Sequence, residues 1–162
     1  MSHLPIIARV ASGDELQATM RRFPSGITVL TLRRPFGVTV GSLASLSLDP
    51  PLVGVAIGLD TQAHELIREE GGFALSILAG DQRELAQHFA RSVPPIAQWE
   101  GIATREGLRG PLLESALAWL ECGLWAEYAA GDHSLFIGKV EAMELGRRGE
   151  GLVYREGGYH SA

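Results

Sequence analysis

A double proline, Pro50-Pro51, divides the stretch 37–60 into two segments, and this division constrains the fold more than any other feature of the sequence. Proline lacks a backbone N–H and does not continue a paired strand, so the chain must turn there. The segment after the prolines, 52–59, is almost continuously apolar. The segment before them, 38–48, carries four hydroxyl side chains, those of Thr39, Ser42, Ser45 and Ser47. We expect both segments to be strands.

Most of the remaining chain also has the pattern of strands joined by short turns. Alternation and β-branched residues predict further strands at 27–32, 73–78, 116–128, 133–145 and 152–154. Helical spacing predicts a helix after Ser12, which would form a capping box with Glu15. It also predicts a helix over 61–70, ended by Gly71-Gly72, and a helix over 81–90, capped by Asp81. Residues 92–112 are expected to form a long irregular excursion.

The order of these elements argues against a Rossmann sheet, because strict strand–helix–strand alternation is absent. A closed or split antiparallel barrel fits better, since closure removes exposed strand edges. The 20 glycines of the chain suit strongly bent barrel strands. We therefore predict a mainly β fold with two or three flanking helices, in a single domain spanning 1–162 whose residues 1–12 form an N-terminal extension.

Charge and apolar patterning exclude several classes of protein. The chain has 14 Lys and Arg against 19 Asp and Glu, a net charge of −5, which argues against nucleic acid or an anionic membrane as a partner. No apolar run is long enough to span a membrane, and the first ten residues lack the core of a signal peptide, so we expect a cytoplasmic protein. The single cysteine, Cys122, excludes an intramolecular disulfide and a Cys-based zinc site, and is expected to be a small buried hydrophobe.

Familiar catalytic motifs are absent. The sequence has no G-x-S-x-G elbow, no P-loop and no G-x-G-x-x-G, and its five histidines do not fall at metal-ligand spacing. The small and hydroxyl residues of 37–48 leave two interpretations open. They could let a planar ligand approach the backbone, whose N–H groups would bind its edge and phosphate, or they could form a sheet face turned to water. Composition alone favours the second.

Six segments, in order, resemble motifs of the short-chain flavin reductases. MRRFPSGITVLTL (20–32) is similar to F-P-[ST]-G-V-x-V-[VL]-T, and GDHSLFIGKVEAM (131–143) is similar to G-D-H-x-[LI]-x-x-G-x-V. The other four segments are the stretch through Pro50-Pro51, 71–90, 111–122 and 152–159. The resemblance implies an FMN-binding split barrel with Greek-key topology. It also implies hydride transfer from NADH or NADPH to FMN or FAD, a homodimer with flavin sites near the subunit interface, and a partner monooxygenase that receives the reduced flavin.

The resemblance further implies roles for individual residues. The isoalloxazine and ribityl chain would be lined by Thr39, Val40, Gly41, Ser42, Leu43, Ala44 and Ser45. The phosphate end would lie near Asp60, Thr61, His64 and Arg91, and the ring edge near Ser76 and Ile77. His133 would be the catalytic residue, placed where the nicotinamide stacks on the flavin, with Tyr159 closing that side. From its own surroundings alone, His133 is expected to be an ordinary hairpin residue.

Three positions depart from the family pattern: Gly41, Ala44 and Ser76. Fewer side-chain donors predict looser flavin binding, an altered choice of flavin or a lost activity. Two other classes of function therefore stay open, a flavin-binding or electron-storage protein without a nicotinamide site, and a flavin-free barrel that acts as a scaffold. Trp119 and Trp125 share a mixed face of 116–128, which we expect to be dimer surface.

Overall fold

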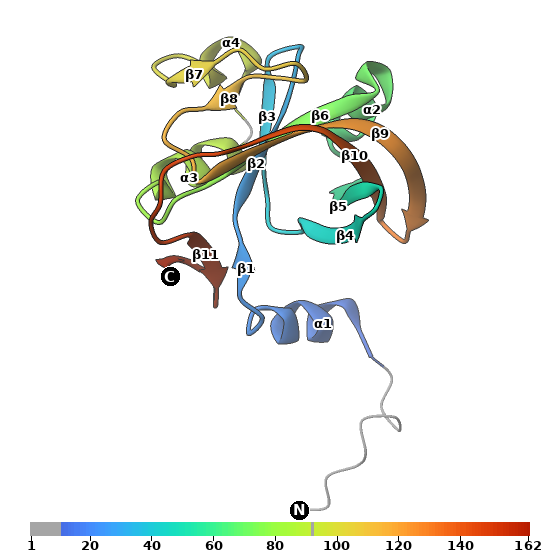
Figure 1. Ribbon diagram of the computed structural model, residues 1–162. Helices are drawn as coiled ribbons and strands as arrows, with labels where there is room; N and C mark the ends of the chain where they lie inside the picture. The colour runs from blue at the N-terminus through green and yellow to red at the C-terminus, as the bar shows by residue number, and fades with distance from the viewer. Residues whose placement is uncertain (1–10, 92) are drawn as a thin grey trace, which may run out of the picture.

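The structure is a computed structural model and describes residues 11–91 and 93–162 (Figure 1). Most of the predicted N-terminal extension, 1–10, lies outside the described residues. The described chain forms a curved antiparallel sheet flanked by helices, with a small second sheet beside it. The mainly β prediction is confirmed.

Seven strands form the large sheet, in the order β3-β2-β6-β9-β10-β5-β4. They are β2 (Thr28–Leu32), β3 (Phe36–Val40), β4 (Ala44–Leu48), β5 (Pro51–Gly58), β6 (Gly72–Ile77), β9 (Ala118–Ala130) and β10 (His133–Leu145). Every neighbouring pair is antiparallel. Because β3 and β4 are the two edges of this sheet yet follow each other in the chain, residues 41–43 cross from one edge to the other, and the barrel is split at this crossing.

The remaining elements surround this sheet. A three-stranded sheet has the order β1 (Ser25–Gly26), β11 (Leu152–Arg155), β12 (Gly158–Ser161), and β7 (Thr104–Arg105) pairs with β8 (Leu112–Leu113). The helices are α1 (Gly13–Met20), α2 (Gln62–Glu70), α3 (Arg83–Ala90) and α4 (Pro95–Gln98). In Figure 1, α1 stands below the barrel beside β1, whereas α2 and α4 lie at the opposite end.

Strand β2 is buried on both faces, so its alternate side chains enter two different cores. Leu30 and Leu32 pack inside the barrel in a cluster that includes Phe73 and Phe136. Val29 points the other way, into a cluster that includes Phe89 of α3. The helix α3 is thereby fixed against the outside of the same strand whose other face fills the barrel.

Two predicted boundaries were wrong. The single strand expected over 38–48 is broken into β3 and β4, because Ser42 is bound to β5: its Oγ accepts from the N–H of Ala56 at 3.0 Å and donates to the same residue's carbonyl at 3.1 Å. The helix expected over 81–90 begins at Arg83 with Gln82 as N-cap. Asp81 does not cap it, since its carboxylate pairs with Arg147.

Several short elements have no recognisable signal in the sequence. The excursion 92–112 contains α4 and β7 among its described residues, and β12 follows the last predicted strand. The capping box of Ser12 and Glu15 is confirmed, as is Gly71 as the left-handed residue that ends α2, with φ of 67°.

The predicted outward face of β9 is partly wrong. Trp119 is buried: its indole N–H donates to the carbonyl of Leu113 at 2.8 Å, and the guanidinium of Arg105 lies 4.3 Å from the ring centre. A register shift opposite Ile137 and Gly138 leaves Trp125 unpaired and 52% exposed. Only Trp125 of the two can therefore contribute to a dimer surface.

Candidate functional site

A cavity of about 350 Å³ lies where the barrel is split, and we call it the seam cavity. Its walls come from β3 and β5, which face each other there although four other strands separate them in the sheet. The lining residues are Val38, Thr39, Val40, Gly41, Ser42, Ala56, Ile57, Gly58, Thr61, Ala63 and His133. Five of the predicted site residues, Thr39, Val40, Gly41, Ser42 and Thr61, are thus brought together with His133.

The contribution of β5 was missed. Ala56, Ile57 and Gly58 line the cavity opposite β3, although the sequence predicts their segment only as an apolar strand. The available signal was the small size of Ala56 and Gly58, because small residues allow a ligand to approach the backbone. A Cβ atom at Gly58 would lie 3.1 Å from Oδ1 of Asp60 and 3.9 Å from Nε2 of His133.

The hydroxyls of the seam cavity are already engaged with the protein's own backbone. Thr39 donates to the carbonyl of Ala86 at 2.6 Å, and Thr61 donates to that of Gly58 at 2.8 Å. Each hydroxyl has one proton and two lone pairs, so these groups can still accept hydrogen bonds from a ligand but have no proton left to give. Among the groups that line this cavity, donation to a ligand is therefore left to backbone N–H groups and to the imidazole of His133.

His133 stands at the rim of the seam cavity because a tight hairpin places it there. Gly131, with φ of 66°, and Asp132 form the two-residue turn between β9 and β10. His133 then pairs with Gly58 in β5. Its Nδ1 lies 2.7 Å from Oδ1 of Asp132, and this hydrogen bond lowers the pKa of the Asp132 carboxyl. The side chain is 48% exposed. The imidazole is therefore accessible to a ligand while the Asp132 carboxylate fixes its orientation.

A second cavity, of about 550 Å³, adjoins the first, and we call it the outer cavity. Val38 and Thr61 line both cavities. The other lining residues are Phe36, Gly37, Asp60, Gln62, Phe89, Ala90, Arg91, Val93, Pro94 and Gln98. Gln98 fastens α4 to the edge strand β3, because its side chain accepts from the N–H of Gly37 at 3.1 Å and donates to that residue's carbonyl at 2.8 Å.

The junction between the two cavities is the start of α2. The side chain of Thr61, the N-cap, makes no capping bond, and the N–H groups of Gln62 and Ala63 have no acceptor within residues 11–91 and 93–162. A helix start with free N–H groups favours an anion. In the same described ranges the guanidinium of Arg91 and the carboxylate of Asp60 have no charged partner, and both line the outer cavity.

Other predicted site residues lie outside both cavities. Ala44 and Ser45 are exposed on the edge strand β4, and Leu43 packs against the barrel core. Ser76 is fully buried, and its Oγ accepts from the N–H of Leu113 at 3.1 Å, while Ile77 follows it at the end of β6. Tyr159 lies in β12 against Tyr154, with ring centres 5.2 Å apart, and burial raises the pKa of its phenol.

His64 is also separate from the cavities. It is only 3% exposed, and its Nε2 lies 2.8 Å from Oγ of Ser134. Ser134 in turn donates to Glu127 at 2.7 Å. The His64 imidazole is thus enclosed between α2 and the β9–β10 hairpin, and it does not face a ligand in the seam cavity.

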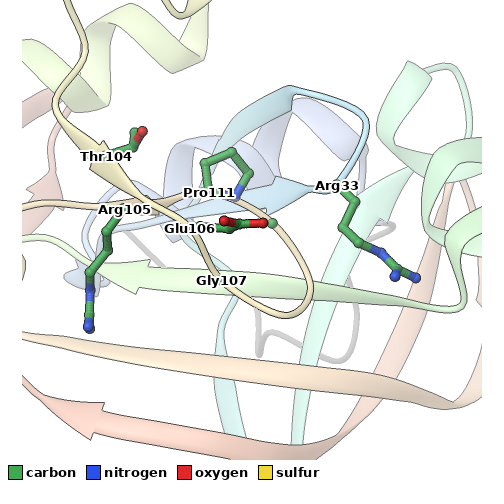
Figure 2. A pocket seen from close by; sticks show the side chains of 7 residues that line it. Arg33, Thr104, Arg105, Glu106, Gly107 and Pro111 are labelled. Atoms are coloured by element: carbon green, nitrogen blue, oxygen red, sulfur yellow. The ribbon is translucent and has the colours of Figure 1, made fainter.

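A third cavity, of about 400 Å³, lies between the β2–β3 turn and the β7–β8 hairpin (Figure 2). Figure 2 shows Arg33 and Arg105 on opposite sides of it with Glu106 between them. Arg105 is bound to Glu144 at 2.7 Å, so its charge is already matched. No predicted site residue lines this cavity, and its charges do not converge on one point.

Two further findings concern the described part of the chain. Residues 11–91 and 93–162 contain no group of three or more His, Cys, Asp and Glu side chains that could hold a metal ion. No helix within those ranges is long and apolar enough to cross a bilayer.

Comparison with known proteins agrees with the geometry of the site. The model of the flavin reductase like domain matches residues 20–162. The chain is 37% identical over 149 residues to the reductase component of 4-hydroxyphenylacetate 3-monooxygenase from Thermus thermophilus, covering 90% of this chain and 94% of that protein. It is 38% identical over 152 residues to an NADH-dependent flavin reductase from Rhodococcus sp., covering 90% and 84%.

Among solved structures, the chain is similar to BorF, the flavin reductase component of a bacterial two-component tryptophan halogenase. The TM-score is 0.87 at 36% identity, covering 93% of this chain and 98% of that one. Three observations lead to one assignment: the family model matches most of the chain, two relatives are more than 30% identical, and the split barrel is shared. The chain belongs to the family of the flavin reductase like domain.

Proposed function

We propose that the protein is an NAD(P)H:flavin oxidoreductase, which transfers a hydride from a reduced nicotinamide to FMN or FAD. The observation that carries the proposal is the seam cavity, which lies in the split between β3 and β5 and has His133 at its rim. In the overall reaction the nicotinamide loses a hydride and becomes oxidised. The flavin gains that hydride, and one proton comes from water.

The residues of the seam cavity fit a flat tricyclic ring. Gly41, Ala56 and Gly58 present little side chain, and a Cβ at Gly58 would come within 3.1 Å of Oδ1 of Asp60. The ring would rest on the backbone of β3 and β5, whose N–H groups hold its polar edge. The start of α2 at Thr61 would hold the phosphate of the flavin, because its N–H groups are free.

The flavin supplies the redox chemistry, and the chain supplies position and polarity. Hydride transfer requires donor and acceptor about 3–3.5 Å apart, so the walls of the cavity contribute mainly by holding the two rings in register. His133, held by Asp132, stands where it can bind the carboxamide of a nicotinamide or hold a proton beside the reduced flavin.

NADH is the donor we expect to be used, since the Rhodococcus relative is NADH-dependent. The reductase of T. thermophilus and BorF are each components of two-component enzymes. We therefore propose that the reduced flavin leaves this protein and serves a separate flavin monooxygenase.

We also propose a homodimer. Helix α1 has no buried residue. Its apolar residues Leu16 and Met20 are more than half exposed, and so is Phe23, which follows the helix. Edge strand β4 exposes Leu46 and Leu48. An exposed apolar edge favours pairing with another chain. Because residues 41–43 run from the seam cavity to β4, an interface on this edge would place the flavin near the subunit boundary.

The activity is tested by adding NADH anaerobically to the protein mixed with FAD or FMN and following the loss of flavin absorbance. We expect bleaching within seconds. Flavin that binds but does not bleach would instead support the electron-storage alternative. Protein that quenches the fluorescence of neither flavin would support the scaffold. The dimer is tested separately by light scattering, where Leu48→Glu should shift the mass toward one chain and Leu108→Glu, at an exposed leucine in the excursion, should not.

A further inference from the structure

The outer edge of strand β3 is bound at one residue by a side chain from another part of the fold. Because β3 is the last strand on one side of the large sheet, its outward N–H and carbonyl groups have no neighbouring strand. At Gly37 these two groups bind the side-chain amide of Gln98, at 3.1 and 2.8 Å. Residues of paired antiparallel strands exchange two hydrogen bonds in the same way. Gln98 therefore takes the place of a neighbouring strand at this position.

Gln98 is itself fixed on several sides. It is only 3% exposed, and its carbonyl lies 2.6 Å from Nε2 of His88 in α3. Its backbone N–H donates to the carbonyl of Pro94 at 3.1 Å. Gly37 is equally confined, because a Cβ there would lie 2.7 Å from two ring carbons of Phe89. Gln98 thus joins α3, α4 and the edge strand β3, whose positions Figure 1 shows.

Thr39 is the next residue that faces the same edge, and its backbone is left open. Opposed residues of an antiparallel pair alternate between bonded and unbonded positions, so the N–H and carbonyl of Thr39 point away from β2, as those of Gly37 do. Within residues 11–91 and 93–162, no loop, turn or helix end supplies a backbone partner for them. Thr39 lines the seam cavity, so a ligand there can reach groups that Gln98 does not occupy.

We infer that Gln98 is a positioning residue for hydride transfer, because its two bonds to Gly37 hold the edge of β3 where the backbone of Thr39 meets the flavin. This inference rests on the proposed function, since it needs the isoalloxazine to occupy the seam cavity. Gln98 acts through β3 and does not touch the reacting atoms. A displacement of about 1 Å at a reacting centre can slow a reaction roughly 100-fold, so the rate of the hydride step is the quantity that should depend on Gln98.

Gln82 offers a matched control, because it makes the same pair of bonds elsewhere in the fold. It is 8% exposed, its Oε1 accepts from the N–H of Ala79, and its Nε2 donates to the carbonyl of Glu114, both at 2.9 Å. Gln82 lines neither the seam cavity nor the outer cavity. Gln98→Leu and Gln82→Leu should therefore destabilise the protein by similar amounts in urea. Only Gln98→Leu should slow anaerobic bleaching at saturating NADH and flavin, by about 10- to 100-fold.

Gln98→Glu tests the same two bonds within one protein. An ionised carboxylate accepts from the N–H of Gly37 but repels its carbonyl, whereas a protonated carboxyl can donate to that carbonyl. The bleaching rate of Gln98→Glu, divided by that of the unmodified protein at the same pH, should therefore rise as the pH is lowered from about 8 to about 5.5. The same ratio for Gln82→Glu should stay constant. If Gln98→Leu does not fold, this pH dependence decides the question.

Two results would overturn the inference. One is a folded Gln98→Leu that bleaches at the unmodified rate, and the other is an equal slowing in Gln82→Leu, since the loss would then come from general destabilisation. A ratio for Gln98→Glu that does not change with pH would contradict it as well.

Hydrogen exchange distinguishes failure of this inference from failure of the proposed function. Without flavin, the N–H of Gly37 should be protected in the unmodified protein and should exchange faster in Gln98→Leu. Adding FMN or FAD should protect the N–H of Thr39 in the unmodified protein. Bleaching without protection of Thr39 would contradict the inference alone. An unmodified protein that neither binds flavin nor bleaches it would contradict the proposed function.

Discussion

Nε2 of His64 lies 2.8 Å from Oγ of Ser134, and this contact joins helix α2 to strand β10 at the residue next to His133. Ser134 donates its only proton to Glu127, so we assign the proton of the His64–Ser134 bond to Nε2 of the imidazole. The contact therefore connects the start of α2, which places Thr61, to the hairpin that places His133. Two predicted functional positions depend on one buried histidine that touches neither cavity.

We expect His64→Ala to destabilise the fold and to weaken flavin binding. The substitution leaves the buried hydroxyl oxygen of Ser134 without its donor, which costs about 1–3 kcal/mol in the free energy of unfolding, whereas Glu127 keeps its hydrogen bonds from Arg68 and Ser134. Urea unfolding measures this loss, and fluorescence quenching should show flavin binding weakened by roughly the same free energy or less. His64→Gln keeps a donor of similar reach and should recover part of both. An Ala variant as stable as the unmodified protein would contradict the assignment.

The fold was predictable from sequence where a local rule decides the structure. The Ser12–Glu15 capping box, the glycine stop at Gly71 and the turn at Pro50-Pro51 depend only on neighbouring residues, and each produced the expected boundary. The split of 38–48 into two strands could not be found in this way. It depends on the hydrogen bonds between Ser42 and Ala56, which are 14 positions apart.

The site was predictable in part for the same reason. The motif around Gly41 marked the β3 side of the seam cavity, because the residues that line it are consecutive. The β5 side was missed, since Ala56 approaches β3 only through tertiary packing. Of the residues that line the outer cavity, Asp60, Thr61 and Arg91 were predicted, and Phe89 was not. Asp81 illustrates the opposite error. Its local position favoured a helix cap, but Arg147, 66 positions away, binds its carboxylate instead.

We expect the protein to become less stable at acidic pH, because the Glu127 carboxylate then becomes protonated. Hydrogen bonds from Arg68, at 2.7 and 2.8 Å, and then from Ser134 lower the pKa of this carboxyl to about 2, from an ordinary value of 4.5. Because the carboxyl has a lower pKa in the folded than in the unfolded protein, its ionised form stabilises the folded state at pH values above 4.5. This contribution is lost as the pH falls from 4.5 toward 2.

Urea unfolding at pH 6, 4 and 3 measures this contribution when the unmodified protein is compared with Glu127→Gln. The variant should be less stable at pH 6, and the difference should shrink at pH 3. Glu69→Gln, at an exposed carboxylate of α2 that pairs with Arg34, is the matched control. A difference that stays constant with pH would contradict the role given to Glu127.

Cys122 should be inert in the folded protein. Its side chain is fully buried, and burial raises the pKa of its thiol to about 12 from an ordinary value of 9.0. At pH 8 the thiolate population is then lower by roughly a thousandfold, so a disulfide reagent should label it only when the chain opens. Labelling should become fast above the urea midpoint. Rapid labelling of the native protein would show that β9 opens locally around this residue.

Ser76→Ala separates a structural role from a binding role. The Ser76 hydroxyl accepts from the buried N–H of Leu113, and its loss should cost about 1–3 kcal/mol in the free energy of unfolding. Because Ser76 lines neither cavity, the dissociation constant of the flavin should change less than about twofold. Ser76→Thr keeps the acceptor and tests whether the site tolerates an added methyl. A flavin affinity lowered tenfold by Ser76→Ala would restore the interpretation of Ser76 as a ring-edge contact.

His133→Ala should slow hydride transfer without abolishing it. The imidazole is held by Asp132 through a 2.7 Å hydrogen bond and stands at the rim of the seam cavity, so its loss removes one oriented polar group while the walls of β3 and β5 stay in place. We expect the anaerobic bleaching rate at saturating NADH to fall roughly 10- to 100-fold, at or below the loss seen when a preorganised donor is removed from other enzymes.

Asp132→Asn distinguishes orientation from mere presence of the imidazole. Its amide oxygen can still accept from Nδ1 of His133 but carries no charge, so the bleaching rate should lie between those of the unmodified protein and His133→Ala. The dissociation constant of the flavin should change little in either variant, because neither residue lies at the junction where the phosphate is proposed to bind. If His133→Ala bleaches as fast as the unmodified protein, the imidazole is only a hairpin residue, and the hydride transfer depends on the cavity walls alone.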